Sequence, residues 1–271
     1  PTGVAAAATG TDVRLPWVDT DTTETRFEVR RRVAGSNTAY VTVATLAANE
    51  TSHTDATGAT DQRFDYVIRA CNAAGCSDSE PVTAETVPAA PGNLRYRVVS
   101  VQARSIVLEW DDRSRFEQQF AIERRAGDSA AWEELARVDA GVTEFPYTGA
   151  PGATDHFRLR ACNGGGCSGP TNEVTVQFAG AAPAPPTGLA ASVEDATSVV
   201  LTWTDAATTE THYEVTRRVP PGEFAIVTIL APDATTYTDH TSTLDEHFEY
   251  VVRACNAGGC GNSDTVPVYT L

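Results

Sequence analysis

Three pairs of cysteines are the residues of this sequence whose type and spacing could do chemistry. Each pair lies in a nine-residue stretch that occurs three times with little change: RACNAAGCS at 69–77, RACNGGGCS at 160–168 and RACNAGGCG at 253–261. Two thiols this close could bind a metal, act as a redox pair or form a structural disulfide. The choice decides whether the chain performs chemistry or holds a shape.

The spacing favours a structural disulfide in each repeat. A tetrahedral zinc site needs four ligands, and each stretch offers two sulfurs and no histidine. Redox pairs prefer the spacing C-x-x-C within a βαβ unit, which does not occur here. Six cysteines with none left over are typical of disulfides in an oxidising compartment, so we expect a secreted or cell-surface protein. The predicted disulfide residues are Cys71, Cys76, Cys162, Cys167, Cys255 and Cys260.

No other pattern predicts catalysis or a cofactor. The sequence contains no nucleophile elbow, phosphate-binding loop or dinucleotide fingerprint. Asp19, Asp21 and Glu24 could supply oxygens to calcium, but only the first repeat has this cluster, and calcium takes six or more oxygen ligands. We therefore expect no catalytic residue, no cofactor and no metal site.

A structural interpretation covers the same acidic residues. The aspartates two residues after a recurring tryptophan are expected to cap the next turn: Asp19, Asp112 and Asp205. The glutamates five residues further on are expected to pair with nearby arginines: Glu24, Glu117 and Glu210 with Arg31, Arg124 and Arg217.

Charge excludes two classes of partner. The 271 residues carry 36 acidic and 20 basic side chains, a net charge of −16, and every basic side chain is arginine. An acidic surface repels phosphate backbones and anionic lipids, so we expect neither nucleic-acid binding nor membrane insertion. Arginine and alanine without lysine are typical of a GC-rich bacterial genome.

The chain consists of three copies of one unit. WVDTDTTETRFEVRRR (17–32), WDDRSRFEQQFAIERR (110–125) and WTDAATTETHYEVTRR (203–218) align without gaps at a period of 93 residues. Proline-rich connectors separate the copies, VPAAPGNL at 87–94 and AGAAPAPPTGL at 179–189, and such segments are semi-rigid. The predicted domains are 1–87, 88–182 and 183–271.

Within each copy the hydrophobic period is two. In SIVLEW, Ile106, Leu108 and Trp110 alternate with Val107 and Glu109. Short alternating runs with turn residues every 8 to 12 positions indicate an antiparallel β-sandwich.

The repeats resemble fibronectin type III domains, especially those of secreted bacterial proteins. The resemblance rests on a proline-rich start followed by glycine and an aliphatic residue (Gly3–Val4, Gly188–Leu189), and on the strand-F ending R-A-x-N-x-x-G. It also rests on recurring aromatics in strands B and C: Trp17, Trp110, Trp203, Phe27, Phe120 and Tyr213. It implies an all-β fold of three tandem immunoglobulin-like sandwiches with seven strands each, and it places the cysteines across the F–G hairpin.

Two features depart from that family. The strand-F tyrosine that forms the family's corner is replaced by Phe64 and Phe248 in the outer copies and by Asp155 in the middle one. The cysteine pair itself is absent from most members.

Recurring aromatics are expected to form the core rather than a binding surface. This applies to the six strand-B and strand-C residues and to a further position occupied by Tyr40, Trp132 and Phe224. Tyr96 and Phe145 do not recur and are the candidates for a contact surface.

The expected function is structural. Nothing but repeats is present, so we expect a non-enzymatic extracellular protein, a beaded rod that serves as a surface stalk, adhesin or filament subunit. Its partner would be itself, another surface protein or a glycan. The alternative is an accessory region of a larger secreted polysaccharide-degrading enzyme, and a third possibility is a module that binds through its F–G loops. The start at Pro1 without methionine indicates a processed chain or an excerpt, and Asn49 lies in a glycosylation sequon.

Overall fold

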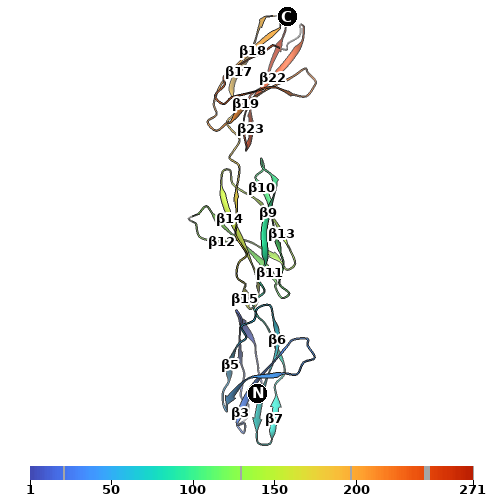
Figure 1. The fold of residues 1–271 in the computed structure, drawn as a ribbon, viewed down its shortest axis with the longest axis vertical. Helices are drawn as coiled ribbons and strands as arrows, with labels where there is room; N and C mark the ends of the chain where they lie inside the picture. Colours follow the sequence, from blue (N-terminus) through green and yellow to red (C-terminus); the bar gives the residue numbers. More distant parts are fainter. Residues whose placement is uncertain (21, 129, 196, 241–244, 271) are drawn as a thin grey trace. The chain divides into compact units, whose positions relative to one another are not determined.

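The computed structural model describes residues 1–20, 22–128, 130–195, 197–240 and 245–270. All of its regular elements are β-strands, which form six sheets that pack in pairs as three sandwiches (Figure 1). Within the described ranges, no helix is long and apolar enough to cross a membrane. The predicted fold class is confirmed.

The first sandwich has a three-stranded and a five-stranded sheet, both antiparallel. The smaller sheet has the order β1 (Ala7–Thr9), β2 (Asp12–Pro16), β5 (Ser52–Ala56). The larger has the order β4 (Val41–Ala47), β3 (Arg26–Val33), β6 (Arg63–Asn72), β7 (Gly75–Asp78), and β8 (Val82–Glu85) also pairs with β6. In the lettering used for fibronectin type III sandwiches, β1, β2 and β5 are strands A, B and E, and β4, β3 and β6 are strands C′, C and F. The strands β7 and β8 together form strand G. This is the arrangement that the resemblance predicted.

The other two sandwiches repeat this topology. The second consists of β13 (Glu144–Thr148), β10 (Ser105–Asp111) and β9 (Gly92–Ser100) against β12 (Glu133–Asp139), β11 (Gln119–Ala126), β14 (Thr154–Asn163), β15 (Gly166–Cys167) and β16 (Val174–Gln177). The third consists of β17 (Thr187–Asp195), β18 (Ser198–Thr204) and β21 (Thr236–Asp239) against β20 (Ala225–Leu230), β19 (His212–Arg218), β22 (His247–Asn256), β23 (Gly259–Asn262) and β24 (Val266–Tyr269).

The last of the seven predicted strands is interrupted in each sandwich. In the first one, β7 and β8 both pair with β6, and Ser79 lies between them. Its amide donates to the carbonyl of Ile68 (2.9 Å), and its hydroxyl accepts from the Ile68 amide (3.0 Å). The Ser79 hydroxyl thus replaces a backbone carbonyl as the acceptor of one hydrogen bond between the strands. The alternation of hydrophobic residues in the sequence does not predict this interruption.

The cores are built on the recurring aromatics. The six strand-B and strand-C aromatics are between 0% and 5% exposed. In each sandwich the strand-B tryptophan contacts the strand-C aromatic, with ring centroids 5.6 to 5.8 Å apart. Each such ring buries 150–250 Å² or so, and this burial dominates the energetics of a small sandwich.

Beside each core a buried aspartate pairs with a half-buried arginine. In the first sandwich Arg31 donates to Asp55 (2.7 Å), and the hydroxyl of Tyr66 donates to the same carboxylate oxygen (2.9 Å). Burial, and then the neighbouring carboxylate, raise the pKa of Tyr66. The third sandwich repeats this cluster with Arg217, Asp239 and Tyr250.

The second sandwich supplies its acid from another strand. Arg124 pairs there with Asp155 on β14 (2.9 Å), the position that holds Phe64 in the first sandwich. Phe157 stands at the position of Tyr66. A buried aspartate is therefore neutralised by a half-buried arginine in all three copies, although the tyrosine hydroxyl is lost from one.

Contacts group the described chain into two compact units. One comprises residues 1–97, 108–145 and 155–175, and the other comprises 98–107, 146–154 and 176–271. The first unit holds the contacts between the first and second sandwiches, and the second holds those between the 179–185 connector and the third sandwich. The predicted domain limits of 1–87, 88–182 and 183–271 stay predictions.

Candidate functional site

The cysteines form one disulfide in each sandwich. Cys71 and Cys76 lie opposite each other on β6 and β7, with their Cα atoms 4.1 Å apart. The equivalent bonds join Cys162 to Cys167 and Cys255 to Cys260. Each bond spans the base of a tight turn, which we call the first (72–75), second (163–166) and third (256–259) hairpin.

An asparagine shapes each of these hairpins. The side-chain oxygen of Asn72, Asn163 or Asn256 accepts from the amide two residues later, at 2.7 to 2.9 Å. This fixes the side-chain amide group beside the turn, where its nitrogen can donate to other segments. The recurrence of the asparagine is visible in the sequence, but its partners are not.

The second hairpin contacts the first sandwich. Asn163 donates through Nδ2 to the carbonyl oxygens of Thr86 (2.9 Å) and Phe116 (3.0 Å). The amide of Gly10 donates to the carbonyl of Gly165 (2.9 Å). One side chain therefore joins the end of the first sandwich to a loop of the second, and the hairpin backbone adds a further bond.

The approach of the two backbones requires glycine at one position of this hairpin. A Cβ atom on Gly165 would lie 2.6 Å from the carbonyl oxygen of Glu85, a distance that Cβ atoms essentially never show. By contrast, a Cβ atom on Gly164 would have no neighbour within 4 Å. Close packing against Glu85 therefore depends on Gly165 and not on the residue before it.

The third hairpin contacts the preceding connector in the same way. Asn256 donates through Nδ2 to the carbonyl oxygens of Ala181 and Thr209, each at 3.0 Å. Gly258 stands at the position of Gly165, and a Cβ atom there would overlap the carbonyl oxygen of Gly180. Two of the three hairpins thus bind the segment that leads into their own sandwich.

The first hairpin differs at the position that must be glycine. Ala74 stands where the others have Gly165 and Gly258, so a methyl group occupies the path of an approaching backbone. Asn72 donates to the hydroxyl of Thr23 at 3.4 Å instead. Beside this hairpin lies an open groove of about 290 Å³, lined by Glu24 and parts of 70–77.

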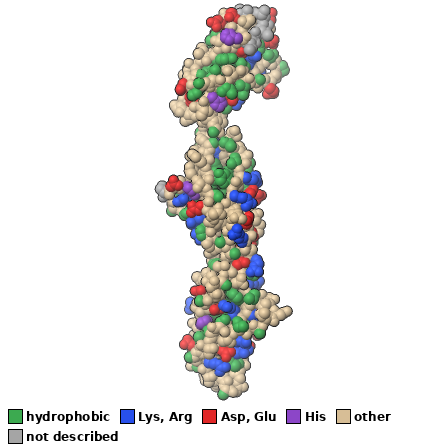
Figure 2. Space-filling view, in the orientation of Figure 1, with side chains coloured by type: hydrophobic (Ala, Val, Ile, Leu, Met, Phe, Trp, Pro, Cys, Tyr) green, Lys and Arg blue, Asp and Glu red, His purple; other side chains and the backbone are tan. Residues whose placement is uncertain are grey.

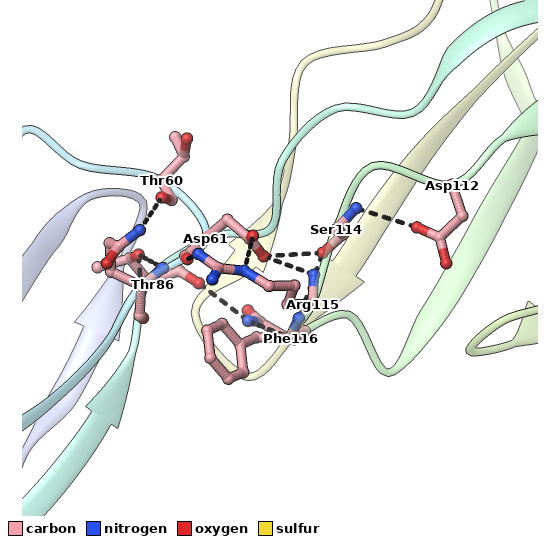
Figure 3. A network of polar contacts seen from close by, with 9 residues as sticks. Thr60, Asp61, Thr86, Asp112, Ser114, Arg115 and Phe116 are labelled. Carbon is pink, nitrogen blue, oxygen red and sulfur yellow. Dashed lines mark hydrogen bonds and ion pairs between the residues drawn. The ribbon is translucent and has the colours of Figure 1, made fainter. Parts of the chain in front are cut away.

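A second contact between the first two sandwiches is a charged cluster (Figure 3). Asp61 accepts hydrogen bonds from the Ser114 hydroxyl (3.0 Å), the Arg115 amide (2.9 Å) and the Arg115 guanidinium (3.2 Å). Asp61 itself adopts a left-handed conformation with φ of 55°, which turns its side chain toward the loop that follows β10. We call Asp61, Ser114 and Arg115 the junction cluster.

The hydrogen bonds matter more here than the ion pair. The Arg115 side chain is 70% exposed, so the ion pair alone contributes about 0–1 kcal/mol. Bonds from an amide and a hydroxyl to a largely buried carboxylate are stronger. Burial raises the pKa of Asp61, but hydrogen bonds from the Arg115 backbone and side chain and from Ser114 outweigh this and hold the pKa below its ordinary value of 3.8.

Two expectations about the acidic residues have different outcomes. The turn caps are confirmed in the second and third sandwiches: Asp112 accepts from the amide of Ser114 (3.0 Å), and Asp205 accepts from that of Ala207 (2.9 Å). The glutamate–arginine pairs are wrong, because Arg31, Arg124 and Arg217 pair with the buried aspartates Asp55, Asp155 and Asp239. Glu24 instead accepts from the backbone amide of Asn49 (3.2 Å).

The calcium ligands suggested by the sequence were Asp19, Asp21 and Glu24. Asp21 lies outside the described residues. In the third sandwich the structure brings Asp205, Glu210 and Asp233 together, with oxygens within 4.8 Å of one another, and Asp205 also accepts from the hydroxyl of Tyr213. An acidic cluster that already accepts internal hydrogen bonds does not by itself indicate a cation, and we assign no site to it.

The third recurring aromatic position is not in the core. Tyr40, Trp132 and Phe224 are half-buried, and each lies under an arginine of strand C: Arg32 at 4.6 Å, Arg125 at 5.2 Å and Arg218 at 4.6 Å. Adjacent residues of a strand face opposite sides, so the first arginine of each pair reaches the buried aspartate and the second covers this ring. The expectation of a core role was wrong for this position.

Tyr96 is the exposed aromatic that the sequence singled out. It lies on β9 and is 40% exposed, and Val98 and Val99, further along the same strand, are each 56% exposed. Arg95 and Arg97 on the same strand pair with the acids of β10 and β13. Figure 2 shows such basic and acidic side chains interleaved over the second sandwich. Phe145, the other candidate, is half-buried.

Comparisons with known proteins found a similar protein sequence and a similar solved structure. No protein-family model matches it. It is similar to Exoglucanase B of Cellulomonas fimi, with 27% identity over 288 residues that cover 96% of this chain and 24% of that protein. The chain thus spans about a quarter of the length of this relative. Among solved structures it is similar to the FN1–FN3 domains of chicken CNTN1, with 16% identity, a TM-score of 0.44, and coverage of 100% of this chain and 98% of that one.

Proposed function

We propose that this chain is a non-catalytic extracellular spacer, whose three sandwiches separate the parts of a larger protein to which it is joined. The observation that carries the proposal is the repeated contact between a disulfide-closed hairpin and the segment that enters its sandwich. Flexible tethers need no such contacts. Asn163 and Asn256 each hold two carbonyl groups in this way.

The larger protein that fits best is a secreted polysaccharide-degrading enzyme. Support comes from the similarity to Exoglucanase B, which extends over nearly all of this chain but only a quarter of the relative. A match of that extent is what an accessory region would produce. The three disulfides suit an oxidising, extracellular environment.

A surface stalk is a second use of the same architecture. A stalk needs the same fixed contacts between sandwiches, and it differs from the spacer of an enzyme only in the domains that are joined to it. Self-association and contacts with another surface protein or a glycan belong to this version, and exposed apolar strand residues such as Tyr96 and Val98 are where such contacts would form.

The spacer proposal is tested by the spread of distances between two domains. Spin labels are attached by a thiol-free reaction at exposed Glu50 and Ala140, and the distance distribution is measured by pulsed electron resonance. We expect a narrow distribution for the native chain and a broad one for a chain with Asp61→Asn and Gly165→Ala. Equal, broad distributions in both chains would refute a fixed junction.

The enzyme version is tested separately. The native chain is mixed with cellulose and other insoluble glucans, and its depletion from solution is measured. A spacer remains in solution and hydrolyses none of them, whereas saturable binding would make the chain a carbohydrate-binding module instead.

A further inference from the structure

At the end of the first sandwich, a turn held by two hydrogen bonds positions Asp61 of the junction cluster. Asp61 adopts φ of 55° and is followed by Gln62, whose amide donates to the hydroxyl of Thr86 (3.1 Å). The amide of Thr86 donates back to the carbonyl of Gln62 (3.0 Å). This pair of bonds fixes the turn from which the carboxylate of Asp61 meets Ser114 and Arg115.

The third sandwich ends with the same arrangement. Asp245 also has φ of 55°, the Glu246 amide donates to the hydroxyl of Thr270 (3.0 Å), and the Thr270 amide donates to the carbonyl of Glu246 (3.0 Å). The sequences agree as well, DQRFDYV at 61–67 against DEHFEYV at 245–251. Asp245 is exposed.

The second sandwich lacks this arrangement, so it is not a general property of the repeat. Gly152, with φ of 71°, occupies the position of Asp61 and offers no carboxylate. Phe178 occupies the position of Thr86, and its amide donates to the carbonyl of Ala153 (2.8 Å) without a hydroxyl to complete the pair. Among the described residues, a carboxylate that could accept the hydrogen bonds of a junction cluster therefore stands at this position in the first sandwich (Asp61) and in the third (Asp245).

We propose that the end of the third sandwich around Asp245 is a docking surface for a further sandwich of this repeat type, one that carries a serine–arginine pair in the loop after its tryptophan strand. The charge of the third sandwich agrees with such a partner, because residues 183–271 hold 12 acidic side chains and 3 arginines. A cationic loop is attracted to that surface at moderate salt. The proposal goes beyond the spacer role and does not depend on whether the larger protein is an enzyme.

The first sandwich of a second copy does not fit this surface. At the positions of Ser114 and Arg115 its sequence has Asp21, which lies outside the described residues, and Thr22, so it lacks the serine–arginine pair. Its hairpin also has Ala74 at the position where close approach requires glycine. The fitting partner resembles the second sandwich, which combines the serine–arginine pair with Gly165.

The test extends the full chain by one domain. A second copy of residues 88–182 is joined after Leu271, which corresponds in sequence to Val87, and the pKa of Asp245 is followed by carbon NMR of its carboxyl group in the extended and unextended chains. We expect the pKa of Asp245 to fall in the extended chain. Hydrogen exchange at the amide of the added arginine should slow, as the Arg115 amide bonds to Asp61.

Two variants control this result. Replacing the added copy's serine and arginine (Ser114→Ala and Arg115→Gln) should return the pKa of Asp245 to its value in the unextended chain. Asp245→Asn, an exposed change, should abolish the slowed exchange. An unchanged pKa together with fast exchange in the extended chain, with all domains folded by their dispersed amide signals, would overturn the proposal.

A further arm tests the choice of partner. The unextended chain should remain monomeric in sedimentation velocity at high concentration and low salt. Head-to-tail association that Asp245→Asn abolishes would show that the surface accepts the first sandwich of another copy, and would overturn the partner proposed here.

Discussion

At the scale of single residues, the buried aspartates show how three copies of one fold solve the same electrostatic problem. A buried charge without a partner is strongly unfavourable, so each of these carboxylates needs a nearby cation, which an arginine of strand C supplies. Asp55 and Asp239 come from the strand preceding strand F, whereas Asp155 comes from strand F itself. The position of the acid is free to change as long as the distance to the guanidinium is kept.

Tyr66→Phe tests the contribution of the hydroxyl in this cluster. The change removes a buried donor to Asp55 but leaves the ion pair with Arg31, so we expect the first sandwich to lose about 1.5–3 kcal/mol. Native-state hydrogen exchange of the β6 amides measures this loss. Tyr96→Phe on the exposed strand is the matched control and should change stability by no more than about 0.5 kcal/mol. Equal effects of both changes would contradict the assignment.

The junction cluster predicts a pH dependence with a definite sign. The pKa of Asp61 is lower in the docked state than its ordinary 3.8, so the docked state binds the proton more weakly. The stabilisation is complete above pH 3.8 and is lost as the pH falls through the lowered value. Distance distributions between the first two sandwiches should therefore broaden only in acid, and Asp61→Asn should broaden them at neutral pH. A distance distribution of the native chain that broadens as the pH rises toward neutral would contradict this prediction.

Residue-level pairing could be predicted only where the partners are near in sequence. The caps at Asp112 and Asp205 reach two residues along the chain, and their pattern is local. Asp61 and Arg115 are 54 residues apart, and no local pattern links two residues so distant in the sequence. The glutamate–arginine pairs failed because strand alternation directs the first arginine of each pair toward the opposite sheet.

At the scale of elements, the hairpins combine a covalent bond with a glycine-dependent contact. Gly165→Ala should weaken the contact between the second hairpin and the first sandwich, because its Cβ would lie 2.6 Å from a backbone oxygen. Gly164→Ala is the matched control, since its Cβ meets nothing within 4 Å. Hydrogen exchange at the Gly10 amide, which donates to Gly165, reports the contact. We expect faster exchange with the first change only.

Removing a disulfide should have consequences that depend on the hairpin. A ring of six residues restricts the unfolded chain little, so each bond contributes about 2 kcal/mol at most. Replacing Cys71 and Cys76 with alanine should speed hydrogen exchange in β6 and β7 and leave the Gly10 amide unchanged. The same replacement at Cys162 and Cys167 should also speed exchange at Gly10, since that hairpin holds the junction. If both replacements changed exchange at the Gly10 amide equally, the disulfide between Cys162 and Cys167 would not support the contact between the second hairpin and the first sandwich.

At the scale of the whole molecule, the two connectors differ in protection. In the first connector residues 87, 88, 91 and 92 are buried around the single exposed Ala90, whereas Gly180, Ala181 and Ala182 of the second are three consecutive exposed residues. Elastase, whose specificity pocket accepts small side chains, should therefore cut the chain first near Ala181. Mass spectrometry of the early fragments measures this. Asp61→Asn should accelerate cleavage near Ala89 and Ala90, and initial cleavage there in the native chain would contradict the prediction.

The overall architecture could be predicted because it repeats. A period of 93 residues, strands of period two and two proline-rich connectors define three sandwiches without any tertiary information. The split last strand and the half-buried position of Tyr40 could not be predicted, since both depend on a side chain that replaces a main-chain or core contact. The junctions depend on contacts between repeats, which the pattern within one repeat does not contain.

The hairpin contacts also impose an order on synthesis. Thr86 binds an asparagine 77 residues further along the chain, and Ala181 binds one 75 residues further along. A ribosome makes the earlier partner first, so each connector remains unbound until nearly the whole of the next sandwich has followed it. The junctions therefore close one after another from the N-terminus, each only when the domain behind it is nearly complete.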